Sequence, residues 1–197
     1  MPSVITIRRA KIGDVRAMHK LLSVFAEKKE LLPRAISELY ENLQQFHVAD
    51  DKGRVVGCCS LAVQWDNLAE VKALAVDPDF QGRGIGRKLL DACLKDAKTL
   101  GITRVFALTM KDGFFDKIGF SRVGKNDLPH KVWTECVRCP YFPDACVEIA
   151  MVKDLGGVAP VPLFKAGDLP ADGTTPTEPE GFPAARRARA GKKRSGS

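Results

Sequence analysis

Three glycines at alternate positions stand between an apolar, strand-like run at 71–76 and a helical pattern at 85–100. They are Gly82, Gly84 and Gly86. Glycine lets the main chain approach a ligand closely, and the first turn of a helix offers N–H groups without helical partners and the positive end of the helix dipole. The pattern therefore predicts a phosphate-binding loop, to which Arg83 and Arg87 add cationic donors.

The spacing of the glycines separates this loop from two common nucleotide-binding loops. A P-loop requires G-x-x-x-x-G-K-[ST], which the sequence does not contain, and a dinucleotide fingerprint requires G-x-G-x-x-G, whereas these glycines read G-x-G-x-G. The pattern that fits is Gln81-x-x-Gly84-x-Gly86, which resembles the acetyl-CoA-binding motif of the GNAT superfamily of N-acetyltransferases. A glycine-rich surface turn is the alternative, and the strand and helix patterns on either side favour the ligand loop.

The resemblance implies which positions contact acetyl-CoA, the acetyl donor. In the family the main chain of the strand before the loop binds the acetyl and pantetheine portions, and the loop amides bind the pyrophosphate. Carried onto this sequence, the cofactor-binding positions are Leu74, Ala75, Val76, Gln81, Gly82, Arg83, Gly84, Ile85, Gly86, Arg87 and Phe115.

The strand expected at 68–76 carries a candidate general base, Glu70. Alternation along a strand places Glu70, Lys72 and Leu74 on one face. An acceptor amine arrives as an ammonium and must lose a proton before it attacks a thioester, and a carboxylate can take that proton directly or through water. Many GNAT relatives carry a glutamate at this position. A solvated strand face is the alternative interpretation.

A proton donor for the departing thiolate is harder to find. Many family members have tyrosine at the start of a Y-x-x-x-G-F segment, but here the segment begins with Phe115, which has no hydroxyl group. Either the thiolate leaves unprotonated, or a water molecule or Thr109 serves as the donor. The next two residues, Asp116 and Lys117, are expected to be charges on a helix surface.

Further segments resemble one branch, the short, single-domain N-acetylglutamate synthases, and imply L-glutamate as the acceptor. They include 31–34, 39–42, 56–61, 105–109 and 128–133. The two carboxylates of glutamate require cations. Arg34 is the leading candidate by resemblance, Lys72 the second, and Lys131 and Arg138 are weaker candidates that could equally be surface charges. The alternatives are another acceptor, such as a different amino acid, a polyamine or a protein N-terminus, or a non-catalytic acetyl-CoA-binding regulator.

The charge of the 197-residue chain is unevenly distributed. Its 31 basic and 24 acidic residues give a net charge of +7, but 186–197 holds six basic residues and no acid, so the rest carries 25 basic and 24 acidic residues. A nearly neutral body does not predict a nucleic-acid-binding face. The sequence has no signal-like segment and no apolar run long enough to span a membrane, so a cytoplasmic protein is expected.

Six cysteines divide into two groups. Cys58, Cys59 and Cys93 lie in apolar patterns and are expected in the core. The others, Cys136, Cys139 and Cys146, have C-x-x-C spacing and could bind zinc with His130 as a fourth ligand, but half of a complete motif is missing. Structural thiols are the favoured interpretation, and no metal is expected.

The elements needed to position these residues follow from periodicity and turn residues. We expect strands at 4–8, 46–49, 55–63, 68–76, 104–108, 120–123 and 146–152, and helices at 12–25, 35–45, 85–100 and 113–118. This order is the layout of the GNAT fold, an α/β (α+β) architecture in which helices cover both faces of a mixed, strongly twisted sheet.

The chain is expected to consist of a folded part and a disordered part. The domain is predicted to span 1–154, followed by a disordered tail at 155–197 that is rich in proline, glycine and alanine and has a basic terminus. Weak contact of the tail with nucleic acid or an acidic surface is one interpretation, and a solvated tail is the favoured one. A homodimer is considered for the domain.

Overall fold

The computed structural model describes residues 5–128, 136 and 146–156. Within this part of the chain one sheet of seven strands has the order β1-β2-β3-β4-β5-β7-β6. The strands are β1 (Thr6–Arg9), β2 (Phe46–Asp51), β3 (Arg54–Val63), β4 (Leu68–Val76), β5 (Arg104–Thr109), β6 (Ser121–Val123) and β7 (Ile149–Asp154). Neighbouring strands are antiparallel except for β4 and β5, so the sheet is mixed, as predicted.

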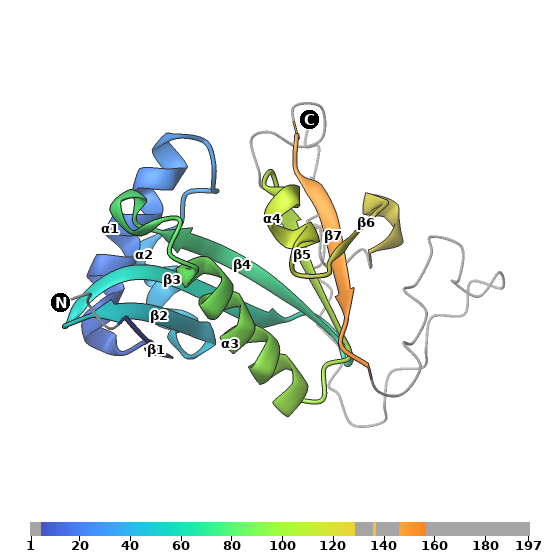
Figure 1. Ribbon diagram of the computed structural model, residues 1–197, viewed down its shortest axis with the longest axis horizontal. Coiled ribbons are helices and arrows are strands. Elements are labelled where there is room, and N and C mark those ends of the chain that lie inside the picture. Colours follow the sequence, from blue (N-terminus) through green and yellow to red (C-terminus); the bar gives the residue numbers. More distant parts are fainter. Residues whose placement is uncertain (1–4, 129–135, 137–145, 157–197) are drawn as a thin grey trace, which may run out of the picture. The chain divides into compact units, whose positions relative to one another are not determined.

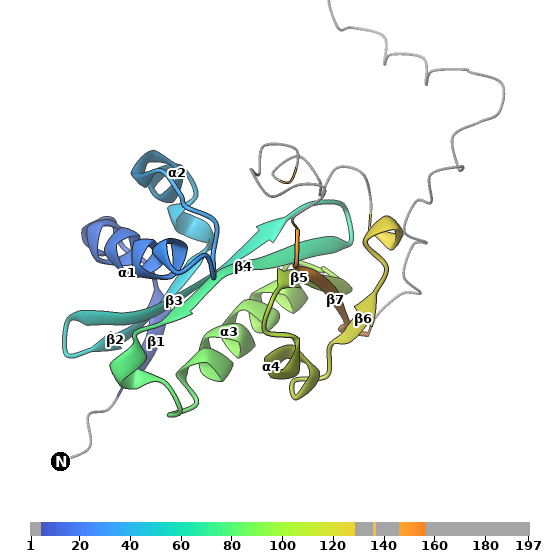
Figure 2. The ribbon, with the colours of Figure 1, turned by 90° about the horizontal axis from the view of Figure 1, so that it is seen from above.

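Helices cover both faces of this sheet, which also agrees with the prediction (Figures 1 and 2). They are α1 (Val15–Glu27), α2 (Ile36–Glu41), α3 (Ile85–Thr99) and α4 (Asp112–Asp116). Seen from above, α1 and α2 lie on one side of the sheet and α3 on the other (Figure 2). Each long helix buries an apolar stripe, which for α1 consists of Val15, Met18, Leu21, Leu22 and Phe25. The core on the α3 side of the sheet contains Cys59 and Cys93, and the core on the α1 side contains Cys58. All three thiols are buried, as expected.

The strands β4 and β5 begin side by side and then diverge (Figure 1). Their pairing covers Leu68–Glu70 on β4 and Arg104–Phe106 on β5, and it ends there although both strands continue. An opening in the middle of a sheet exposes main-chain groups and side chains of both strands. This opening lies directly before the glycine loop in the sequence.

A β-bulge changes the face of β4 in the same region. The register with β3 shifts between Cys58 and Ser60, and Ala73 on β4 has a positive φ of 53°. Beyond the bulge, Leu74 packs in the α3-side core with Val71, whereas Ala73 packs in the α1-side core. The expectation that Leu74 shares a face with Glu70 and Lys72 is therefore wrong, because strict alternation holds only in a strand without a bulge.

The predicted elements are all present, with shifted ends. The helix expected at 35–45 ends at Glu41, where the Asn42 side-chain amide donates to the carbonyl oxygen of Glu38, and a 3₁₀ turn (Leu43–Gln45) follows. The strand expected from 146 begins at Ile149, and the helix expected from 113 begins at Asp112. A tight turn with positive φ at Lys52 and Gly53 connects β2 to β3.

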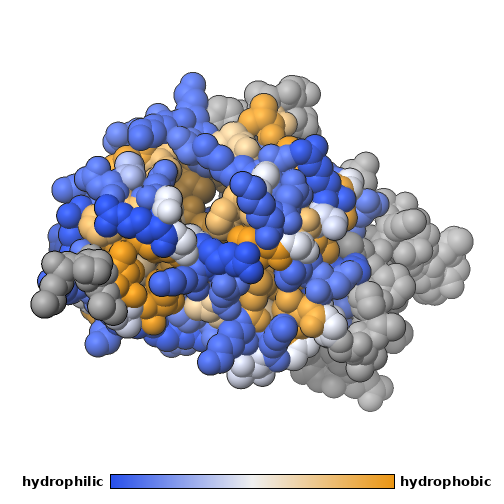
Figure 3. Space-filling model, viewed as in Figure 1, coloured by the Kyte–Doolittle hydropathy of each residue, from blue (hydrophilic) through white to orange (hydrophobic). Residues whose placement is uncertain are grey.

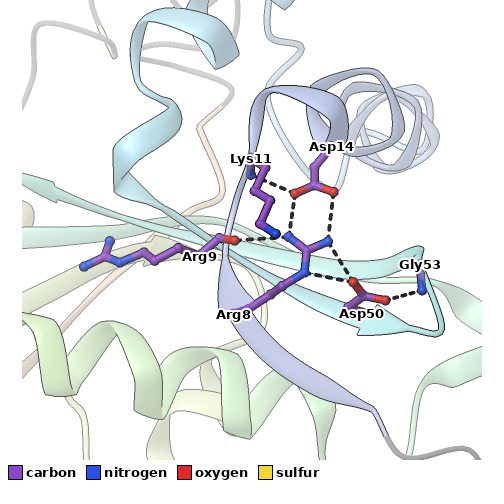
Figure 4. Close-up of polar contacts among 6 residues, drawn as sticks. All are labelled: Arg8, Arg9, Lys11, Asp14, Asp50 and Gly53. Atoms are coloured by element: carbon purple, nitrogen blue, oxygen red, sulfur yellow. Dashed lines mark hydrogen bonds and ion pairs between the residues drawn. The ribbon is translucent and has the colours of Figure 1, made fainter.

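A polar cluster ties β1 to the start of α1 and to the β2 hairpin (Figure 4). The Arg8 guanidinium donates two hydrogen bonds to Asp14, at 2.7 and 3.0 Å, and one from Nε to Asp50 at 2.8 Å. The hydrogen bonds from Arg8 hold the pKa of both carboxyl groups below the usual aspartate value. This cluster anchors α1, the helix that leads into the segment carrying Arg34.

Candidate active site

A large groove of about 770 Å³ opens where β4 and β5 diverge. In Figure 3 this face of the molecule is hollowed near its centre, with apolar side chains at depth. One wall is β4 from Val71 to Val76, and the other is formed by 108–111 at the end of β5 and by α4. The glycine loop closes the end of the groove at the start of α3. The predicted positions Leu74, Ala75 and Val76 all line it.

The glycine loop has the geometry of an anion cradle. Gly82 and Gly84 have positive φ values of 75° and 73°, and a Cβ at either position would meet no atom within 4 Å. Gly84 is the N-cap of the 15-residue helix α3, so the first N–H groups of α3 point toward the loop. The Gln81 side-chain amide donates to the carbonyl oxygen of Val76 at 3.0 Å and fixes the loop to the strand. Open space over main-chain donors fits a pyrophosphate group.

The two loop arginines lie in different places. Arg87 lines the large groove, with its Nε 3.5 Å from Asp91. Arg83 instead donates to the carbonyl oxygen of Asp79 at 2.8 Å and stacks on Phe80, with 4.9 Å between the guanidinium carbon and the ring centroid. These contacts give Arg83 the geometry of a loop support and Arg87 that of a groove-lining cation.

Phe115 is a buried wall residue of the groove. Its ring makes edge contacts with Phe114 and Phe120, at centroid distances of 5.2 and 5.1 Å. Thr109, the hydroxyl residue proposed above as a proton donor, also lines the groove and accepts a hydrogen bond from the Lys111 main-chain N–H at 2.9 Å. The hydroxyl proton of Thr109 thus remains available for another acceptor.

A small pocket of about 60 Å³ adjoins the large groove. The two cavities share five lining residues, which are Leu31, Lys72, Ala73, Leu108 and Glu148. The small pocket brings together side chains that are far apart in the sequence: Arg34 before α2, Glu70 and Lys72 on β4, and Glu148 just before β7. Two predicted cations and the predicted base therefore face one pocket, next to the groove.

Glu70 is held in a defined position at this pocket. Its side chain is buried, and its Oε2 accepts a hydrogen bond from the Gln64 amide at 3.0 Å. The same oxygen lies 3.5 Å from the ammonium group of Lys72. The alternative of a solvated strand face is wrong, because both side chains are largely shielded from water.

Several predicted residues fall outside the described part of the chain. They are His130, Lys131, Arg138 and Cys139. Cys136 is buried and lines the small pocket. The Cys146 sulfur accepts a hydrogen bond from Lys125 Nζ at 3.1 Å. Among residues 5–128, 136 and 146–156, no group of three His, Cys, Asp or Glu side chains is placed to hold a metal ion.

The structure also shows lining residues that the sequence did not indicate. Lys111 and Lys117 line the large groove, and Lys111 pairs with Glu30 at 3.2 Å. Lys117 was expected on a helix surface, although its position two residues after Phe115 could have indicated the groove. Glu148 had no local signal, because it reaches the pocket through the pairing of β5 with β7.

The chain belongs to the Acetyltransferase (GNAT) family, whose model matches residues 15–120. The matched region contains β4, the glycine loop and α3. Acetyl-CoA is the acetyl donor of this GNAT acetyltransferase.

Three similar proteins extend this assignment. An uncharacterised N-acetyltransferase of Chlorobaculum tepidum is 38% identical over 79% of this chain and 100% of its own length. An amino-acid acetyltransferase of Mycobacterium tuberculosis is 38% identical over 67% of this chain and 77% of its own. The crystal structure of N-acetylglutamate synthase from Neisseria gonorrhoeae, complexed with coenzyme A and N-acetyl-glutamate, superposes with a TM-score of 0.71 at 26% identity, over 80% of this chain and 36% of that one.

Helices long and apolar enough to cross a membrane are absent from the part of the chain that the structure describes.

Proposed function

We propose that this acetyltransferase transfers the acetyl group of acetyl-CoA to the α-amine of L-glutamate. The observation that carries the proposal is the small pocket, in which Arg34, Lys72 and Glu70 face one space beside the groove. Two cations suit an acceptor with two carboxylates, and a carboxylate suits its ammonium group. The amino-acid acetyltransferase of M. tuberculosis and the N-acetyl-glutamate complex of the N. gonorrhoeae enzyme support this acceptor. The product, N-acetyl-L-glutamate, is the first intermediate of arginine biosynthesis.

Each residue has a proposed role in the transfer. Glu70 takes a proton from the acceptor ammonium, directly or through water, so that the nitrogen lone pair can attack the thioester carbonyl. A nitrogen–carbon bond forms, the nitrogen gives its second proton to water, the carbon–sulfur bond breaks, and the thiolate leaves with or without a proton from Thr109 or water. Main-chain N–H groups of β4 around the bulge polarise the carbonyl.

The remaining proposed contacts hold the two substrates. Arg34 binds a glutamate carboxylate with its planar pair of donors, and Lys72 binds the second one while staying close to Glu70. The loop from Gln81 to Arg87 binds the pyrophosphate of the donor. Lys131 and Arg138 remain proposed acceptor contacts that lie outside the described residues.

The test is thiol release from acetyl-CoA with a panel of amino acids, polyamines and peptides. We expect L-glutamate to give the highest kcat/KM. We also expect Arg34→Ala to raise the KM for glutamate by about 10- to 100-fold, because a hydrogen-bonded charge pair is lost. Arg16→Ala, an exposed arginine on α1, is the matched control and should leave KM unchanged. Release with glutamate no higher than in buffer would reject glutamate as the acceptor.

A further inference from the structure

Glu148 lies at the junction of the two cavities, because it lines both the large groove and the small pocket. It directly precedes β7, whose first residue, Ile149, pairs with Thr109 at the end of β5. This pairing places Glu148 beside the end of β5, on the side of the opening that lies across from β4. The acetyl carbon of a bound donor must reach the same junction, since the acceptor pocket opens into the groove there.

Glu148 and Glu70 both line the small pocket, Glu70 from β4 and Glu148 from the residue directly before β7. If the alternation of side chains in β7 is extended one residue back, Glu148 falls on the same side as Ala150. Ala150 packs in one cluster with Leu68, and Leu68 shares its side of β4 with Glu70. Both carboxylates therefore lie on the same face of the sheet, one on the β4 side of the opening and one on the β7 side.

The charges around the small pocket match a zwitterion. Its titratable lining groups in the described chain are two cations, two carboxylates and one buried thiol: Arg34, Lys72, Glu70, Glu148 and Cys136. An α-amino acid brings carboxylate and ammonium groups together, and each has a counterpart here. Glu70 Oε2 accepts a hydrogen bond from the Gln64 amide and lies 3.5 Å from Lys72 Nζ. A second carboxylate can hold the ammonium in place while Glu70 accepts its proton.

We propose that Glu148 binds the α-ammonium group of the acceptor amino acid at the junction and determines specificity for amino acids over their des-amino analogues. The inference rests on the proposed function, since it assigns one more contact at the same site. Glu148 acts on the bound amine, whereas Arg34 acts on a carboxylate, so the two contacts can be separated by ligands that keep only one kind of group.

The experiment compares L-glutamate, as acceptor, with glutarate, which keeps both carboxylates but has no ammonium, as a competitive inhibitor. In Glu148→Gln we expect the KM for glutamate to rise about 10- to 100-fold, the range for a lost hydrogen bond to a charged group. The inhibition constant of glutarate should stay within about twofold of the wild-type value, because glutarate has no ammonium group for the Glu148 carboxylate to bind. Glu148→Asp should recover part of the loss, and Glu41→Gln, an exposed glutamate on α2, is the matched control.

A merely structural role predicts a different result, in which both constants rise by the same factor and the KM for acetyl-CoA rises with them. That outcome, or an unchanged KM for glutamate, would overturn the proposed role of Glu148. The proposed function would still stand if the wild type acetylates glutamate. If the wild type instead acetylates another amino acid, the same comparison is made with that amino acid and its des-amino analogue. A wild type that acetylates no amino acid overturns both proposals.

Discussion

Glu70 shows how the surroundings of one residue define its chemistry. The side chain is buried and is held by an amide and an ammonium group, so its carboxylate has one orientation instead of many. The proposed role of general base requires a carboxylate that is held within reach of the proton that it removes.

Replacing this carboxylate with the isosteric amide in Glu70→Gln should lower kcat by about 100-fold or more, because general-base catalysis contributes on that order. The rise of kcat with pH on the acidic side should weaken, since the group whose deprotonation produces it is gone. The KM for acetyl-CoA should not change. Steady-state kinetics from pH 5 to about 9 check this. A pH profile identical to that of the wild type would remove Glu70 as the base.

At the residue scale, the sequence predicted only those candidate site residues that lie close together along the chain. The loop glycines and Glu70 lie within one strand–loop–helix unit, so their relation could be predicted from their separation along the chain. Arg34 could be predicted only by resemblance, and Glu148 not at all. Both reach the small pocket through long-range packing, which no short pattern records.

At the scale of elements, the bulge in β4 decides which side chains meet. An alanine at positive φ gives no sign of a bulge in the sequence, because glycine is the residue usually expected there. The alternation argument therefore succeeded for Glu70 and Lys72, before the bulge, and failed for Leu74, after it. The divergence of β4 from β5 was equally hidden, because both strands read as ordinary apolar runs.

The Arg8 cluster is the element-scale feature with a measurable pH dependence. Its two carboxyl groups have lowered pKa values because Arg8 donates hydrogen bonds to them. A carboxyl group whose pKa is lowered on folding stabilises the protein above its unfolded pKa, about 3.9, and this stabilisation is lost as the pH falls through the lower folded value. The contribution of the cluster should therefore be complete at neutral pH and disappear in acid.

We expect Arg8→Met to lower the free energy of unfolding at pH 7 by about 1–3 kcal/mol, since the charge-assisted hydrogen bonds to the part-buried Asp14 are lost. The difference from the wild type should shrink as the pH falls below about 4. Denaturant unfolding at several pH values measures it. Arg122→Met, which removes an exposed ion pair with Asp112, should cost less than about 1 kcal/mol and serves as the control. A difference that stays constant into acid would contradict the assignment to these carboxylates.

At the scale of the whole molecule, the order of elements was predictable because each strand and helix carries its own periodicity and turn residues. The strand order in the sheet was not predicted, because it depends on long-range pairing that no local pattern records. The placement of β7 between β5 and β6 has the largest functional consequence, since it brings the segment before β7 to the small pocket.

The same scale decides how much of the chain the activity requires. The last strand ends at Asp154, and the Leu155 main-chain N–H still donates to the carbonyl oxygen of Thr103 at 2.8 Å. We therefore expect a variant that lacks 157–197 to keep its kcat and both KM values within about twofold, because the cavity-lining side chains of the described residues, 5–128, 136 and 146–156, all precede that segment. Steady-state kinetics and thermal unfolding of the shortened and full chains measure this. A variant that also lacks Leu155 and Gly156 is the sharper comparison, because it should lose stability through the missing hydrogen bond while the shorter deletion does not. Loss of activity in the 157–197 deletion would show that this segment takes part in binding or catalysis.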